Sequence, residues 1–246
     1  MSAQSLPEPP DLDTLLEDGP VALFLDFDGT LVEIAETPDA IEVPGDLVER
    51  VCALEKRLGG RLAVVSGRAL DDLESHTGPL PVACAGSHGS HCRAADGGDV
   101  GEPPASLSHE ARQAIADFVE GTAFSLEEKT HGAALHYRAD PSLEDEGLAF
   151  AERLAEKHDI VVKRGKCVIE LVADGSDKAS AVRVFMESEP FRGARPIFIG
   201  DDVTDEDGMR AATELAGFGI AVGERPSENA SYALASPAAV HHWLRL

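Results

Sequence analysis

The chain has 246 residues, and its 45 acidic residues outnumber its 21 basic residues, giving a formal net charge of −24 at pH 7. This charge disfavours nucleic acid as a partner, because the phosphate backbone would be repelled. The length suits one large domain or two modest ones, and an apolar content of 43% is enough for an ordinary hydrophobic core. An anionic substrate is still compatible if local cations or a metal ion reverse the field at its site.

Residues 1–20 are acidic and contain several prolines, and we predict an N-terminal tail here. They lack the basic region and apolar run of a signal peptide, and no stretch of the sequence approaches the ~20 apolar residues of a membrane span. The four cysteines form no CxxC pair, and the segment CAGSHGSHC at 84–92 does not match the spacing of a common zinc module. We therefore expect a reduced, cytoplasmic protein with no membrane partner.

Short runs of apolar, often β-branched residues recur along the chain. They lie at residues 21–25, 61–65, 82–85, 195–199 and 218–222. Because they are apolar continuously rather than at alternate positions, they are typical of strands buried on both faces of a parallel sheet. Segments with helical spacing lie between them, for example the one that carries Leu47, Val51 and Leu54. This alternation predicts an α/β fold with a Rossmann-like, doubly wound parallel sheet as its core.

The middle of the chain has a different pattern, in which one helix and two strands occur twice. A helical stripe starts at Leu107 and precedes two strand-like stretches; a second helix at about 143–157 precedes strands near 159–163 and 166–172. This order predicts an α+β unit with an antiparallel sheet, inserted into the core. The expected segments are 21–104 (core, first part), 105–173 (inserted domain) and 174–246 (core, second part).

Polar residues stand where the predicted core strands end. Asp26 and Asp28 follow the first strand together with Gly29 and Thr30, Ser66 follows the second, Asp201 follows the fourth, and Lys178 opens the helix before the fourth. Ligands of parallel sheets bind beyond the carboxyl ends of the strands, so these groups should meet at one edge. Any one of them could be a helix cap, a turn former or a surface charge. All of them together indicate a functional site.

The chemistry that suits this set is phosphoryl transfer. Asp26 and Asp201 offer the hard oxygen ligands that Mg²⁺ takes, and the metal supplies the positive charge that two nearby carboxylates need. With Mg²⁺ and Lys178 beside it, Asp26 stays ionised and can attack phosphorus to form an aspartyl-phosphate.

The remaining groups fit supporting roles in the same reaction. Asp28 lies two residues beyond Asp26 on the same side of an extended chain, where it can protonate the leaving oxygen and then deprotonate a water molecule. Thr30 and Ser66 offer hydroxyl groups to the phosphoryl oxygens. Lys178 neutralises the charge of the transferring group, which is the main demand of this chemistry.

The segments DFDGTL, VVSGR, DKAS and GDDVTDED resemble, in order and spacing, the four motifs of the haloacid dehalogenase superfamily of phosphatases. The resemblance implies the haloacid dehalogenase fold with a type 2 cap inserted between the second and third motifs. It implies Asp26 as nucleophile and Asp28 as general acid/base. The implied phosphate-binding residues are Thr30, Ser66, Gly67 and Lys178; the implied metal ligands are Asp26, the backbone carbonyl of Asp28 and Asp201, with Asp202 and Asp205 supporting.

Further segments narrow the resemblance. DFDGTLVEIAETPDAIEVP, AGSHGS, LEEKTHGAALHYR and GKCVIEL are similar to the trehalose-6-phosphate phosphatase family, over about residues 21–244. This similarity implies Mg²⁺-dependent hydrolysis of trehalose 6-phosphate and a functional link to a trehalose-6-phosphate synthase. It implies that Glu127, Lys129 and Glu170 bind sugar hydroxyls and that Arg68 and His88 lie close to the sugar. Without the motif context, the first three would be solvated charges; the roles of His136 and Arg138 stay undecided.

Three other interpretations remain open. A related sugar-phosphate phosphatase, of the sucrose-phosphate or mannosylglycerate-phosphate type, would use the same scaffold. A phospho-receiver module also has an acidic Mg²⁺ pocket and a lysine, but it places the acidic pair and the phosphorylated aspartate on different strands and has no inserted cap. A regulatory subunit without turnover is disfavoured because every catalytic group is retained.

Overall fold

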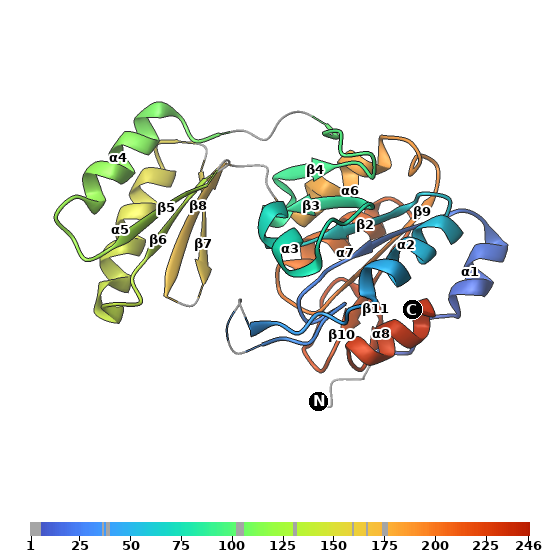
Figure 1. Cartoon of the computed structure of the whole chain (residues 1–246). Coiled ribbons are helices and arrows are strands. Elements are labelled where there is room, and N and C mark those ends of the chain that lie inside the picture. The colour runs from blue at the N-terminus through green and yellow to red at the C-terminus, as the bar shows by residue number, and fades with distance from the viewer. Residues whose placement is uncertain are drawn as a thin grey trace. The chain divides into compact units, whose positions relative to one another are not determined.

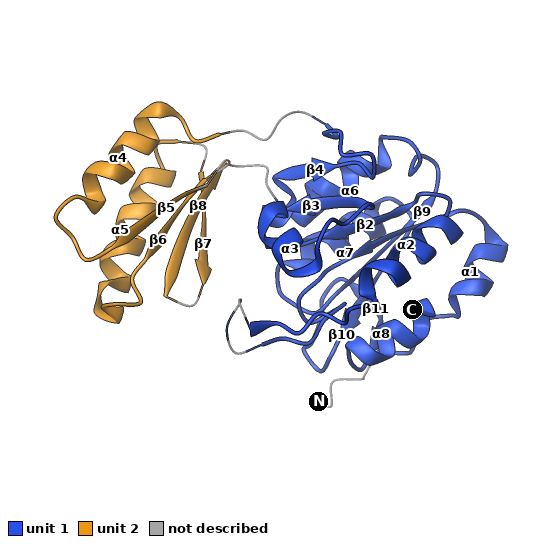
Figure 2. Ribbon diagram, viewed as in Figure 1, with its two compact units in different colours: residues 1–103, 177–246 blue, residues 104–176 orange. Residues whose placement is uncertain are grey.

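The computed structural model describes residues 6–35, 37, 40–101, 106–129, 132–158, 160–165, 167–173 and 177–246. The chain divides into two compact units, which Figure 2 shows in different colours: residues 1–103 with 177–246, and residues 104–176. The second unit is a single insertion into the first. It spans residues 104–176, and the sequence analysis predicted an insertion at 105–173.

The first unit contains a seven-stranded sheet in the order β11-β10-β9-β1-β2-β3-β4 (Figure 1). All neighbouring strands are parallel except β3 and β4. The strands are β1 (Val21–Leu25), β2 (Leu62–Val65), β3 (Ala83–Gly86), β4 (His91–Arg93), β9 (Arg195–Gly200), β10 (Phe218–Val222) and β11 (Ala230–Leu234). The helices are α1 (Leu12–Asp18), α2 (Leu47–Arg57), α3 (Leu70–Thr77), η2 (Ser87–Gly89), α6 (Lys178–Met186), α7 (Asp205–Glu214) and α8 (Pro237–Leu244).

Strand β1 is buried along its whole length because the sheet is covered on both faces. Leu23 belongs to the hydrophobic cluster that includes α2, α3 and α8, whereas Phe24 belongs to the cluster that includes α6 and α7. Burying one such side chain contributes about 1.5–3 kcal/mol to folding. The continuous apolar runs of the sequence thus form a parallel sheet between two helical layers, as predicted.

Residues 6–20, the described part of the predicted tail at 1–20, belong to the folded core. They contain α1, whose Leu12 and Leu15 are buried in the main core. The backbone of this segment is also tied to the C-terminal part of the chain: the Trp243 indole N–H donates to the Pro10 carbonyl oxygen (2.9 Å), and the Ala233 amide donates to Pro7 (2.9 Å). The prediction relied on charge and proline content, which conceal the short apolar stripe of LDTLLED.

The second unit is a four-stranded antiparallel sheet in the order β5-β6-β8-β7 with helices on one face. Its elements are α4 (His109–Val119), β5 (Ser125–Lys129), β6 (Gly132–His136), η3 (Pro141–Leu143), α5 (Glu144–Ala155), β7 (Ile160–Gly165) and β8 (Val168–Ala173). It has its own core, in which Ile115 of α4 and Leu148 of α5 pack with Leu135 and Leu171 of the sheet. The predicted change from a parallel to an antiparallel sheet is therefore present.

Candidate active site

Three neighbouring strands, β9, β1 and β2, each deliver one polar side chain to the carboxyl edge of the core sheet. Asp26 follows β1 and is 4% exposed, and its amide continues the ladder by donating to the Ile199 carbonyl oxygen (2.9 Å). Ser66 follows β2 and is fully buried. Asp201 follows β9. The register of the parallel strands, with Leu25 opposite both Ile199 and Val64, brings these positions to the same level.

Lys178 is a buried residue, not a surface charge. A capping box starts α6: the Asp177 carboxylate accepts from the Ser180 amide (2.7 Å), and the Ser180 hydroxyl oxygen accepts from the Asp177 amide (3.2 Å). This places Lys178 in the first turn of α6. Its Nζ donates to Oδ1 of Asp26 (2.6 Å) and to Oδ1 of Asp205 (2.5 Å). Burial would lower the pKa of Lys178, but the two carboxylates outweigh it and raise that pKa, so the ammonium stays charged.

The carboxylates of Asp26, Asp201 and Asp205 each place an oxygen within 4.8 Å of the others. Burial and the charge of Asp205 raise the pKa of Asp26 well above its ordinary value, and Lys178 only partly opposes them. Burial, Asp205 and Asp202 raise the pKa of Asp201 to about 6. One ammonium therefore does not compensate three carboxylates, and the cluster has the charge of a cation site.

Two buried oxygen atoms support this interpretation. Within the described ranges, Oδ1 of Asp201 and Oγ1 of Thr30 have no hydrogen-bond partner. A buried polar atom without a partner is costly, and ligands commonly satisfy such atoms. Gly29 permits the close packing: its φ is +83°, and a Cβ there would overlap the Asp201 carboxylate. The residues present thus fit a hard divalent cation beside a phosphoryl group.

Asp28 is held by an arginine. Nε and Nη2 of Arg68 donate to its two carboxylate oxygens at 2.7 and 2.8 Å, and Nη1 donates to Asp72 at 2.9 Å. Phe27, which lies between Asp26 and Asp28 in the sequence, is buried in the hydrophobic core. The side chains of Asp26 and Asp28 therefore both point away from that core. Arg68, which we predicted to lie close to the sugar, is therefore a direct partner of the predicted general acid in this structure.

His88 lies against the residue that follows Ser66. A Cβ at Gly67 would come within 2.7 Å of the His88 ring, so a larger residue at this position would displace the imidazole. His88 has φ +60° and ψ 25°, a left-handed conformation within η2. Its backbone amide donates to the Ser66 carbonyl oxygen (2.9 Å), which joins the two loops. His88, Gly67 and Ser66 thus lie next to one another.

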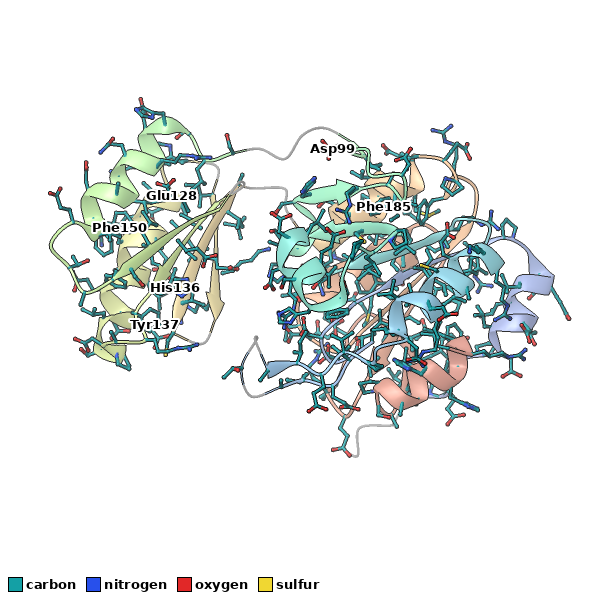
Figure 3. The ribbon with its side chains drawn as sticks, viewed as in Figure 1. Asp99, Glu128, His136, Tyr137, Phe150 and Phe185 are labelled. Carbon is teal, nitrogen blue, oxygen red and sulfur yellow. The ribbon has the colours of Figure 1, made fainter. Side chains whose placement is uncertain are left out.

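The inserted unit carries the other predicted substrate residues. Glu127 and Glu170 are both in register with Ala134 of β6, so they share a row across the sheet. Glu127 is exposed, and its Oε2 lies 2.8 Å from Nε2 of His136, within hydrogen-bond distance. Figure 3 shows His136 on this sheet. The side chain of Lys129 lies outside the described part of the structure.

One residue near the acidic loop was missed by the sequence analysis. Arg225, in the loop after β10, donates to the carbonyl oxygens of Asp201 and Asp202, each at 2.9 Å. It lies in none of the motifs. The only signal in the sequence is a basic residue shortly after a predicted core strand.

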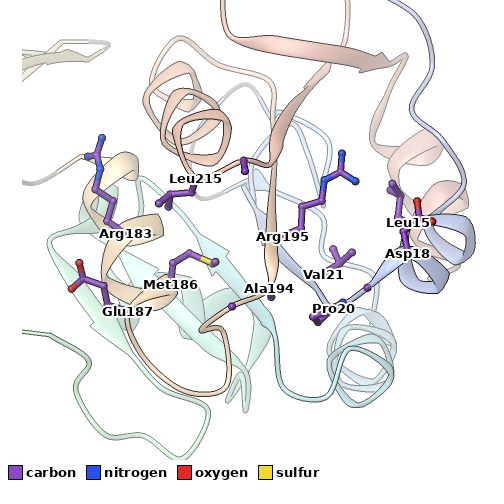
Figure 4. A pocket seen from close by; sticks show the side chains of 13 residues that line it. Leu15, Asp18, Pro20, Val21, Arg183, Met186, Glu187, Ala194, Arg195 and Leu215 are labelled. Carbon is purple, nitrogen blue, oxygen red and sulfur yellow. The ribbon is translucent and has the colours of Figure 1, made fainter.

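A cavity of about 660 Å³ at the other edge of the sheet is separate from these groups (Figure 4). It adjoins Val21 and Arg195, the first residues of β1 and β9, whereas Asp26 and Asp201 follow the last residues of these strands. Its lining includes apolar side chains such as Leu15, Met186 and Leu215. The cavity therefore contributes nothing to the acidic cluster.

The fold is of the haloacid dehalogenase type. The structure is similar over 92% of its length to 93% of a phosphatase of the haloalkanoate enzyme superfamily from Bacteroides thetaiotaomicron (TM-score 0.66, 14% identity). It is similar over 98% of both chains to the C-terminal domain of trehalose-6-phosphate phosphatase from C. albicans (TM-score 0.73, 23% identity). The predicted fold class is confirmed.

Sequence comparison identifies the family. The trehalose-phosphatase family model matches residues 24–238. Trehalose-6-phosphate phosphatase of Escherichia coli is 34% identical over 92% of this chain and 85% of its own length. A probable trehalose-phosphate phosphatase of Sinorhizobium fredii is 39% identical, over 87% of this chain and 82% of its own. The chain belongs to the trehalose-phosphatase family, which confirms the predicted resemblance and the enzyme class, a phosphoric monoester hydrolase.

Among the described residues, no helix is long and apolar enough to cross a lipid bilayer.

Proposed function

We propose that this protein hydrolyses trehalose 6-phosphate to trehalose and phosphate, with Mg²⁺ as cofactor and an aspartyl-phosphate as intermediate. Family membership supports the substrate. The observation that carries the chemistry is the buried cluster in which Lys178 contacts both Asp26 and Asp205 while Asp201 lies beside them. A phospho-receiver would not have the inserted unit, and a non-catalytic subunit would not need the complete cluster.

In the first step, a carboxylate oxygen of Asp26 attacks phosphorus and the bond from phosphorus to the sugar oxygen breaks. Asp28 gives a proton to that oxygen, so that the sugar leaves as an alcohol. In the second step, Asp28 takes a proton from water, whose oxygen attacks phosphorus; the bond to Asp26 breaks and phosphate leaves. Lys178, Ser66, Thr30 and the Gly67 backbone hold the phosphoryl oxygens through both steps.

Asp26, Asp201 and the backbone carbonyl of Asp28 would hold Mg²⁺, with Asp202 and Asp205 as supporting residues. When bound, Mg²⁺ supplies positive charge that neutralises the transferring group. The charge excess of the cluster and the unpartnered Asp201 oxygen support this assignment.

The sugar is the part of the substrate that the inserted unit would recognise. Glu127, Lys129 and Glu170 are suited to hydrogen-bond sugar hydroxyls, because carboxylates accept and an ammonium donates strongly. Arg68 and His88 would lie near the sugar on the core side. A related sugar-phosphate phosphatase would keep the catalytic cluster and differ at these positions. The synthase link and a cytoplasmic location also stay predictions from the sequence.

A phosphate-release assay across trehalose 6-phosphate, sucrose 6-phosphate, mannosylglycerate phosphate and glucose 6-phosphate tests the proposal. We expect the highest kcat/KM for trehalose 6-phosphate, and no turnover with EDTA or with the nearly isosteric Asp26→Asn. Alanine at Glu127 or Glu170 should raise KM for trehalose 6-phosphate only. Equal rates on glucose 6-phosphate would contradict the substrate, and turnover by Asp26→Asn above contamination would contradict the nucleophile.

A further inference from the structure

Arg225 holds the backbone of the acidic loop that follows β9. Its Nε donates to the Asp201 carbonyl oxygen and its Nη2 to the Asp202 carbonyl oxygen, both at 2.9 Å. The same guanidinium donates through Nη1 to the Pro226 carbonyl oxygen (2.9 Å) and through Nη2 to Oε1 of Glu206 (2.7 Å). The hydrogen bonds of this one planar guanidinium thus connect the loop after β9 to the loop after β10.

Glu206 completes this arrangement. Its Oε2 accepts from the backbone amides of Glu228 (3.2 Å) and Asn229 (2.9 Å) and from Nδ2 of Asn229 (3.0 Å). The Glu206 side chain is 16% exposed and that of Arg225 is 30% exposed. Because the carboxylate offsets the guanidinium charge, Arg225 can bind the loop carbonyls without leaving an uncompensated cation beside a cation site.

The same loop is fixed from its other side by α7. Oδ2 of Asp205 accepts from the Asp202 amide (2.8 Å), while Oδ1 of Asp205 accepts from Lys178. The peptide groups around Asp201 are therefore satisfied from two directions. Oδ1 of the Asp201 carboxylate is not, because it is buried without a hydrogen-bond partner in the described ranges. The backbone of Asp201 is thus held by hydrogen bonds, whereas Oδ1 of its side chain is available to bind a cation.

We propose that Arg225 is a positioning residue for the metal site: by fixing the carbonyls of Asp201 and Asp202, it presents the Asp201 carboxylate to Mg²⁺. The inference rests on the proposed Mg²⁺ dependence but concerns a residue outside the motifs that define it. A lysine does not replace the fork, because an ammonium has no planar set of donors matched to several fixed carbonyls. Loss of an outer partner of a metal ligand typically weakens metal affinity by about 10–100-fold.

Direct titration of the protein with Mg²⁺ by calorimetry, without substrate, tests this role. We expect Arg225→Ala to raise Kd for Mg²⁺ by about 10–100-fold, and Arg225→Lys to raise it in the same direction. The matched control is Arg183→Ala, which removes an ion pair to α7 through Glu214 (2.7 Å) but touches no residue of the acidic loop. It should leave Kd unchanged. Melting temperatures without metal are measured for every variant.

The outcomes separate positioning from stability. A Kd within twofold of the wild type in both Arg225 variants overturns the inference, whether or not their melting temperatures fall. If Arg225→Ala does not fold, Arg225→Lys decides by the same criterion. If the wild type binds Mg²⁺ no better than Asp201→Asn does, the proposed metal dependence fails first and the inference falls with it.

Discussion

At the scale of single residues, Arg68 contacts Asp28, the proposed general acid. The side chain of Arg68 is 9% exposed and makes a bidentate, charge-assisted contact to Asp28, which adds both strength and a defined geometry. A second carboxylate, Asp72, fixes the remaining arm of the guanidinium. Arg68 thus holds the carboxylate of Asp28, the proposed general acid, in addition to the sugar contact proposed for Arg68.

We expect the substitution Arg68→Gln to affect catalysis in a way that depends on the leaving group. General acid catalysis contributes about 10²–10⁴-fold, and a misplaced Asp28 should lose part of it, about 10-fold or more in kcat on a sugar phosphate. On p-nitrophenyl phosphate the loss should be small, because the leaving anion is stable without a proton. Asp72→Asn, which keeps both hydrogen bonds to Asp28, is the control.

A double-mutant cycle separates the two roles of Arg68. In an Asp28→Asn background, Arg68→Gln should cause no further loss of kcat, because the group that it positions is gone. A rise of KM that persists in both backgrounds would report the sugar contact. Additive losses of kcat would contradict positioning.

The sequence predicted Asp26, Ser66, Lys178 and Asp201 because each follows a strand or opens a helix at one edge of the sheet, where their side chains must converge. It missed Arg225 for a physical reason. Arg225 contacts Asp201 and Asp202 through their backbone carbonyls, which every residue possesses, so these two contacts leave no trace in residue type.

At the scale of elements, the N-terminal helix shows where charge misleads. Four of the eight residues from Asp11 to Asp18 are acidic, and an interpretation from composition gives these charges more weight than the three leucines among them. The structure buries Leu12 and Leu15 of α1 to 2% and 5% exposure. A segment that contributes two leucines to the main core is part of the fold.

The substitution Leu12→Ala tests whether α1 contributes to the stability of the core. Truncation of a buried leucine costs about 2–5 kcal/mol, through lost transfer energy and the cavity left behind. We expect a loss of this size in the free energy of unfolding, measured with urea. Thr14 lies in the same helix and is exposed, so Thr14→Ala should change the free energy of unfolding by less than about 0.5 kcal/mol. A tail would give two equally small effects.

The elements that the sequence located best are those whose pattern reflects burial alone. Strands β1 and β10 coincide with the predicted runs at 21–25 and 218–222, because both are buried along their whole length. Strand β11 (Ala230–Leu234) was missed, since only Leu234 in it is buried and the others are partly or fully exposed. Strand β4 is three residues long and carries no pattern at all.

At the scale of the whole molecule, the two units differ in chemistry. The residues proposed to hold Mg²⁺ all belong to residues 1–103 and 177–246, whereas the inserted unit has a separate core. The sequence revealed this division because apolar periodicity changes where the parallel sheet gives way to the antiparallel one. The net charge of −24 is a property of the chain as a whole and acts on any cation in solution.

Mg²⁺ should therefore stabilise one unit specifically, in addition to a general effect of salt. At a concentration of about 100 times Kd, a bound ligand adds about 2.7 kcal/mol to the stability of the unit that binds it. We expect hydrogen exchange to slow in peptides that contain Asp26 and Asp201 and to stay unchanged in β5 to β8. NaCl at matched ionic strength controls for screening of the acidic surface, and Asp201→Asn should abolish the specific part. Equal protection of both units, or the same protection with NaCl, would show that Mg²⁺ acts only through the overall charge.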